Sequence, residues 1–238
     1  MIDLPSAVRG DTLDYPSQGA IFGLAIPWMA SPPTYTDLPP YWSARRDWVL
    51  SNTPKKEDMW GSAVAIATTR FAAHGFTISD STDSQRKVSA SQELMKRADG
   101  GQGWVTFAQK IMRDLLTTDN GVFIAIRRDG DDTQRIRVKA ERTIQGAQTA
   151  GYADAQVTIS NPGAKITGLY HLDSLRCVRT GNLAYPLRYY SVQGWQQIYR
   201  WDQVLMYADQ PSPRAEHFGV GECAASRAYH TIAKIAPK

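Results

Sequence analysis

Between residues 122 and 208 the sequence is a succession of short runs rich in β-branched and aromatic residues. Runs such as "VFIAIRR" and "KITGLYHL" have the length and composition of strands. Turn residues separate the runs at "DGDD", "NPG", "TGN" and "VQG". Helical periodicity is confined to the segments before and after this region. We therefore predict an α+β fold with amphipathic helices, an antiparallel β-meander and a C-terminal helix.

The strands at 122–128 and 134–142 flank "DGDD", and we expect them to pair as a hairpin. "DGDD" lacks the remaining ligands of a calcium loop and is more simply a turn.

Two segments before the strands carry apolar residues at the three- and four-residue spacing of a helix. The first begins near Thr53 as a cap, with Pro54 in its first turn and Gly75 as a left-handed end. Its expected apolar face is Met59, Trp60, Ala63, Val64, Ala67 and Phe71. The second runs from about Trp104 to Thr118. Shorter helices are expected at 42–51 and 91–97, a short strand at 76–78, and a final helix over "ECAASRAYHTIAKIA".

Residues 1–53 combine many prolines with many aromatic residues, which predicts an extended arm rather than a solvated linker. Such an arm needs a surface to lie on, either its own domain or a neighbouring subunit. We expect an α+β domain at 54–216 and a glycine joint followed by a helix at 217–238.

Bulk composition limits the classes of protein. The 238 residues carry a formal net charge of +4, which permits contact with nucleic acid without requiring it. Cys177 and Cys223 are too few for a disulfide framework or a zinc site of four cysteines, which favours a reducing compartment. The apolar stretch 19–30 is too short to span a bilayer, and no basic leader precedes it. We expect no membrane association.

The stretch "HFGVGECAASRAYH" at 217–230 is the best candidate for chemistry. As a phosphate loop it lacks the third glycine and a following βαβ unit. As a thiol site it would use Cys223 with His217 or His230 as base, but the alanines and serine that follow are typical of a packed helix face. We interpret Gly219, Gly221 and Cys223 as a structural joint, and expect no catalytic residue, metal or cofactor.

Arg135, Arg137 and Lys139 alternate along one strand and therefore share a face. They are candidates for contact with nucleic acid backbone. The alternative is a solvated sheet face with salt bridges to neighbouring carboxylates.

Four stretches in order resemble the N-terminal wing portion of a tailed-bacteriophage portal protein, over about residues 40–236. They are "TPKKEDMWGSAVAIATTRFAAHGFTIS", "WVTFAQKIMRDLLTTDNGVFIAIRRDG", "ITGLYHLDSLRCVRTGN" and "YRWDQVLMYADQPSPRAEHFGVGECAASRA". The second is similar to the family's helix, "D-x-L-L-x-x-[GD]-N-G/A" turn and strand. Ser174 stands where proline is usual, Tyr207 where histidine is frequent, and "ECAAS" replaces "SPL".

The resemblance implies a non-enzymatic ring of about a dozen identical subunits at one capsid vertex. Such a ring is assembled in the host bacterial cytoplasm and conducts double-stranded DNA during packaging and ejection. Its implied partners are the major capsid protein, the terminase and a head-completion or adaptor protein. Trp28, Tyr41, Trp42 and Trp104 are our candidates for subunit contacts. Typical portals are longer and add a stem, a clip and a crown, so the resemblance implies either a partial chain or a smaller relative.

Two alternatives stay open. One is another virion structural protein, such as a minor capsid or head-completion component. The other is a cysteine-dependent or DNA-processing enzyme that uses Cys223 or the Arg135 face.

Overall fold

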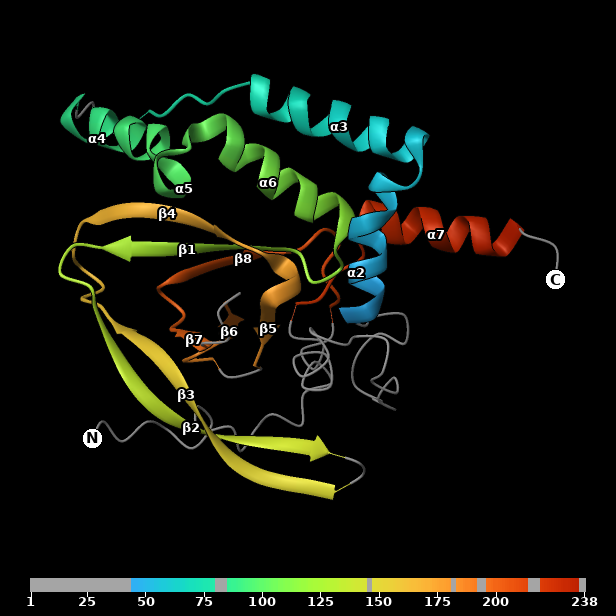
Figure 1. Ribbon diagram of the computed structural model, residues 1–238. Coiled ribbons are helices and arrows are strands. Elements are labelled where there is room, and N and C mark those ends of the chain that lie inside the picture. Colours follow the sequence, from blue (N-terminus) through green and yellow to red (C-terminus); the bar gives the residue numbers. More distant parts are fainter. Residues whose placement is uncertain are drawn as a thin grey trace.

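A computed structural model describes residues 44–79, 85–144, 147–180, 183–191, 196–213 and 219–235. Helices form a layer over one face of a three-stranded sheet, and a second sheet lies on the other side (Figure 1). The predicted α+β class, with helices first, strands next and a helix at the C-terminal end, is confirmed. Residues 1–43 of the expected arm lie outside the described residues.

Each of the expected helices has a counterpart in the structure. Their bounds are α2 (Ala44–Asn52), η2 (Thr53–Lys55), α3 (Asp58–Ala73), α4 (Gln85–Lys96), α5 (Ala98–Gly101), α6 (Gly103–Thr117) and α7 (Ala224–Ile235). Helix α6 matches its prediction to within a residue, and Phe107 and Ala108 on it are buried.

Helix α3 begins later than predicted. The Thr53 hydroxyl donates to the carbonyl of Val49 in α2 at 2.8 Å, and Thr53 is the first residue of η2 instead of the cap of α3. The predicted apolar face was also wrong in part, because Met59 is 90% exposed and Phe71 is exposed as well. The cause is the position of α3 in the outermost layer, packed on α6 (Figure 1). Gly75 has the expected left-handed backbone, with φ of 63°.

The strand predicted at 76–78 does not form. Phe76 instead packs its ring edge-on against Trp104 of α6, with ring centroids 4.9 Å apart.

The strands form two sheets. The first has the order β4 (Ile166–Leu172), β1 (Val122–Arg128), β8 (Val204–Tyr207), all antiparallel. The second has the order β2 (Asp132–Ile144), β3 (Ala147–Ile159), β7 (Gln196–Tyr199), β6 (Leu187–Tyr190), β5 (Cys177–Arg179). In the second sheet β3 and β7 are parallel, and the other neighbours are antiparallel.

The predicted hairpin between β1 and β2 is wrong. Strand β1 pairs with β4 and β8 along its two edges, whereas β2 pairs with β3 along its full length. The turn itself exists, because the Asp131 carboxylate accepts a hydrogen bond from the Arg128 amide at 2.7 Å. This turn connects β1 in the first sheet to β2 in the second. The strands therefore form two sheets instead of the predicted single meander.

The main core lies between the sheets. Phe123 and Leu187 are fully buried there, and Leu172, Cys177 and Val204 pack with them. The far half of the β2–β3 ribbon extends beyond this core (Figure 1).

Candidate functional site

The turn that ends helix α6 is buried throughout, although it is polar. Thr118, Asp119, Asn120 and Gly121 are all buried, and Asp119 is fully so. The carboxylate of Asp47, in the first turn of α2, accepts hydrogen bonds from the backbone amides of Asp119 at 2.8 Å and Asn120 at 3.1 Å. These bonds attach α2 to the end of α6.

The carboxylate of Asp119 in turn holds the start of α7. It accepts hydrogen bonds from the Cys223 amide at 2.9 Å and from the Ser226 hydroxyl at 3.0 Å. The Asp119 carbonyl also accepts the Gly221 amide at 2.9 Å. A carboxylate at a helix N-terminus satisfies amides that have no partner within the helix and interacts favourably with the helix dipole.

Asn120 connects the same turn to the second sheet. Its side-chain amide donates to the carbonyls of Ser174 at 3.0 Å and Cys177 at 2.9 Å. The buried guanidinium of Arg179 donates to the Asn120 carbonyl at 2.8 Å and lies 5.0 Å above the ring of Phe123. We name this set the Asp119 junction: Asp47, Asp119, Asn120, Arg179, Cys223 and Ser226.

Two glycines allow the backbones around the junction to approach closely. A Cβ on Gly221 would lie 2.0 Å from the carbonyl oxygen of Asp209. A Cβ on Gly121 would lie 2.2 Å from the carbonyl oxygen of Tyr207, and its φ of 86° also disfavours other residues. Gly219, with φ of 77°, adjoins the guanidinium of Arg179. The glycines predicted as a joint therefore lie against Arg179 and the segment after β8.

Cys223 lies within the junction and is 1% exposed. Burial, and next the nearby carboxylate of Asp119, raise the pKa of the Cys223 thiol. Its sulfur accepts a hydrogen bond from the Ser226 amide at 3.4 Å. This environment disfavours the thiolate that nucleophilic chemistry requires. His217 and the side chain of His230, the proposed bases, lie outside what the structure describes.

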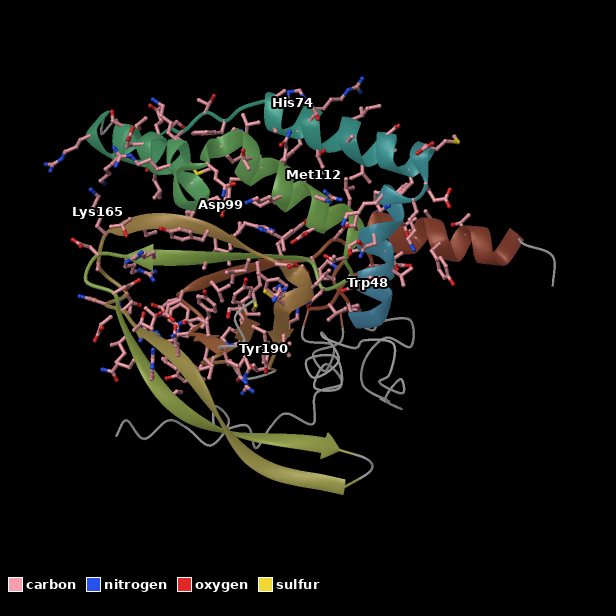
Figure 2. All side chains as sticks on the ribbon, in the orientation of Figure 1. Trp48, His74, Asp99, Met112, Lys165 and Tyr190 are labelled. Carbon is pink, nitrogen blue, oxygen red and sulfur yellow. The ribbon has the colours of Figure 1, made fainter. Side chains whose placement is uncertain are left out.

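A second polar cluster joins α6 to β4. His171 Nε2 lies 2.8 Å from an oxygen of Asp114, and both side chains are mostly buried. Burial raises the pKa of Asp114, and the hydrogen bond with His171 opposes that rise. Asp99 accepts the His171 amide at 3.2 Å and pairs with Lys110. Figure 2 shows Asp99 in the space between the helical layer and the sheet.

A cavity of about 260 Å³ lies between the two sheets. Its walls largely bond to one another: Gln203 donates to the Thr158 carbonyl at 2.7 Å, and Gln197 to the Thr158 hydroxyl at 2.9 Å. Asp131 Oδ1 is buried without a hydrogen-bond partner among the described residues. One such acceptor does not define a class of ligand.

Of the predicted contact residues, the structure describes the side chains of Trp104 and Arg135. Trp104 is half-buried in the helical layer beside Phe71 and Phe76. Arg135 is exposed near the beginning of β2. Arg137 and Lys139 share its face by register, and Trp28, Tyr41 and Trp42 lie outside the described residues. The side chains of Arg137 and Lys139 are not described either.

Sequence reasoning identified "TDNG" only as a turn and missed its role. One signal was available: the polar residues 118–121 directly connect an amphipathic helix to a buried strand. So short a connection between two packed elements favours burial of its polar side chains. Asp47, the partner on α2, is flanked by "RR" and "WVL" and carries no motif.

The fold and the junction define an α+β protein whose separate elements are joined by buried hydrogen bonds. In the ranges that the structure covers, no three His, Cys, Asp or Glu side chains gather in a way that could hold a metal ion. Within the same ranges, none of the helices combines the length and hydropathy needed to cross a membrane. Comparison with protein-family models, curated proteins and solved structures finds no match for the chain.

Proposed function

We propose that the chain is the wing portion of a phage portal protein, a structural subunit of a ring at one capsid vertex. The observation that carries the proposal is the composition of the Asp119 junction. Three of the four stretches that resemble the portal family contribute to it: "TDNG" at 118–121, "LDSLRC" at 172–177 and "GVGECAAS" at 219–226. Segments far apart in the sequence, which the resemblance identifies separately, thus form one structural unit.

The Asp119 junction fixes the orientation of α7 relative to the rest of the molecule. Helix α7 leaves the body of the molecule (Figure 1), and its first turn is held by Asp119 from the end of α6. In the portal interpretation this helix leads towards the channel-forming part of the ring. Hydrogen bonds to a buried carboxylate fix the orientation of the helix more strictly than apolar contacts alone, because they are directional.

The enzyme alternative receives less support. Cys223 is buried with a raised pKa, which disfavours a thiolate nucleophile. The basic face of β2 is compatible with a portal and with a DNA-processing factor, because both approach nucleic acid backbone. The proposed ring conducts double-stranded DNA and binds the terminase and head-completion proteins at one capsid vertex.

Native mass spectrometry of the protein, with negative-stain imaging, tests the proposal. We expect closed rings of about a dozen copies with a central channel. A monomer that persists at every concentration examined would contradict it, and a thiol-sensitive activity of that monomer would favour the enzyme. Deleting residues 1–40 tests the arm separately: a loss of rings supports its role in subunit contact, whereas unchanged rings exclude that role.

A further inference from the structure

Strand β8 exposes three consecutive large apolar residues at the edge of its sheet. Leu205 is 54% exposed, Met206 36% and Tyr207 62%. The strand order is β4–β1–β8, so no described strand lies beyond β8. Folded proteins usually protect such an edge with charges, proline or a covering element, because it can pair with another strand.

The backbone of β8 also has hydrogen-bonding groups that pair with no backbone group among the described residues. The Ile126 amide donates to the Gln203 carbonyl at 2.8 Å, which fixes the hydrogen-bonding phase of the β1–β8 pair. Because hydrogen-bonded pairs alternate in antiparallel strands, Leu205 and Tyr207 bond towards β1, and Val204 and Met206 face outward. No backbone bond from the outward groups of Val204 or Met206 to another described residue is present.

Both faces of the sheet would continue onto an added strand. Leu205 is opposite Ile124, and Tyr207 is opposite Val122, on the side of the helical layer. Met206 is opposite Phe123, which lies in the core between the sheets. Helix α6 packs on β1 and β4, whereas the side chains of Leu205 and Tyr207 on β8 stay more than half exposed. The surface therefore fits an extended apolar segment that bonds through its backbone.

The chain itself holds a segment with these properties. Residues 19–26, "GAIFGLAI", contain neither proline nor charge and lie between Pro16 and Pro27. Their length is that of an ordinary strand. The segment belongs to the 43 residues that precede α2, and these enter the described molecule at the end of β8 that carries Tyr207. Asp47 of α2 binds Asn120, two residues before Val122, which is opposite Tyr207.

The connecting chain is long enough. Residues 27–43 can span up to about 56 Å when extended, whereas a four-residue strand is about 13 Å long. The segment can therefore reach the free edge of β8 from its own chain or from an adjacent copy.

We propose that residues 19–26 add to the free edge of β8 as a further strand of the first sheet. Main-chain hydrogen bonds to Val204 and Met206 supply the pairing, and the apolar side chains of the segment cover Leu205, Met206 and Tyr207. This docking accounts for an apolar edge that would otherwise favour aggregation.

Photo-crosslinking of the full chain tests the proposal. A benzophenone amino acid placed at Tyr207 is expected to crosslink to residues 19–26, identified by peptide mass spectrometry. The matched control is the same group at Ile66, an apolar position on α3 that is 54% exposed, which is expected not to reach that segment. Crosslinks from position 207 to any other segment, including β8 of a second copy, would overturn the proposal. The mass of the crosslinked product distinguishes a segment of the same chain from that of a neighbour.

Amide exchange supplies a second measurement that does not depend on crosslinking chemistry. Leu24→Pro removes a backbone donor from the segment, and we expect the amides of Val204 and Met206 to exchange at least about tenfold faster. The amide of Leu205, bonded towards β1, is expected to stay slow. Ser31→Pro, outside the segment, is the control and leaves all three unchanged. Val204 and Met206 amides that already exchange at the unprotected rate in the parent chain would contradict the proposal.

Discussion

The Asp119 carboxylate accepts a hydrogen bond of 3.0 Å from the hydroxyl of Ser226, although 107 residues separate the two in the sequence. Both residues are fully buried. The same carboxylate accepts the Cys223 amide, and Asp47 accepts the amide of Asp119 itself. One turn of the chain therefore links the first described helix, the helix before the sheets and the last helix.

Asp119→Asn tests the energetic weight of this link. The change keeps the shape but removes the charge and one acceptor, so a donor of Cys223 or Ser226 loses its partner. We expect the free energy of unfolding to fall by about 1.5 to 3 kcal/mol, measured by urea denaturation. The control is Asp129→Asn at the exposed turn after β1, which is expected to stay within about 0.5 kcal/mol. Equal effects of the two changes would contradict the importance of the junction.

Gly221→Ala tests the close approach of the joint to the segment after β8. The new methyl group would lie 2.0 Å from a backbone oxygen of Asp209, which can move only with the chain. We expect the free energy of unfolding, measured by thermal or chemical denaturation, to fall by about 1 to 3 kcal/mol. Gly163→Ala is the matched control, because its methyl group would lie 3.6 Å from the nearest atom, an ordinary contact. A neutral Gly221→Ala would show that the backbones can separate at this point.

The two thiols are expected to be unreactive in the folded protein. Both cysteines are buried, and burial raises the pKa of Cys177 as well as that of Cys223. Native protein mixed with a disulfide reagent at pH 8 should therefore react at least about tenfold more slowly than protein in guanidinium chloride. Cys223→Ser should leave the assembly intact. One thiol that reacts rapidly in the native state would revive the cysteine-enzyme interpretation.

Asp202 predicts a pH dependence of stability. Hydrogen bonds from the Arg200 guanidinium, at 2.5 and 2.8 Å, hold the pKa of Asp202 below its ordinary value. A lowered pKa in the folded state stabilises the protein above the unfolded value of about 3.9, and this stabilisation is lost as the pH falls through the folded pKa. We expect Asp202→Asn to lower the free energy of unfolding by about 1 to 3 kcal/mol at pH 7. The difference in this free energy between the variant and the parent should shrink below about pH 4.

The control for this measurement is Glu93→Gln, which removes an exposed pair with Arg97 on α4. Exposed ion pairs contribute little to stability, so Glu93→Gln should change the free energy of unfolding by less than about 0.5 kcal/mol at every pH. A difference between Asp202→Asn and the parent that is constant from pH 7 to pH 3 would show that the carboxylate charge is not involved.

The basic face of β2 makes a prediction about DNA. If Arg135, Arg137 and Lys139 each neutralise a phosphate, replacing all three by glutamine lowers the salt slope of duplex binding by about 2 to 3. Fluorescence anisotropy at several salt concentrations measures that slope. The charge-matched control replaces three other exposed basic residues: Lys55 at the end of η2, Lys56 just after it, and Arg70 on α3. Equal slopes for both triple variants would remove any special role of β2.

Local elements were predictable because their signals are local. Helix α6 carries its apolar stripe within one segment, and β1 is bounded by "TDNG" and "DGDD", so both were predicted to within a residue. The pairing of β1 was not predicted correctly, because its partners β4 and β8 follow it in the sequence by tens of residues. A turn beside a strand favours a hairpin in the sequence, and tertiary packing decided otherwise.

The junction could not be derived for a similar reason. Asp47, Asp119 and Ser226 are ordinary polar residues, and only the fold brings them into contact. The residue type alone does not show whether an aspartate will be buried or exposed. The predicted face of α3 failed because periodicity locates apolar residues without showing how many neighbours a helix has: Met59 and Phe71 follow the period but α3 lies in the outermost layer.

The Asp119 junction also determines how load would travel through the molecule. A pull on α7 acts first on Ser226 and Cys223, passes through the Asp119 carboxylate to the turn, and reaches α2 through Asp47. This route consists of hydrogen bonds of 2.8 to 3.0 Å to two carboxylates and includes no strand. We therefore expect a tilt of the last helix to act on the first helix through these bonds rather than through the strands.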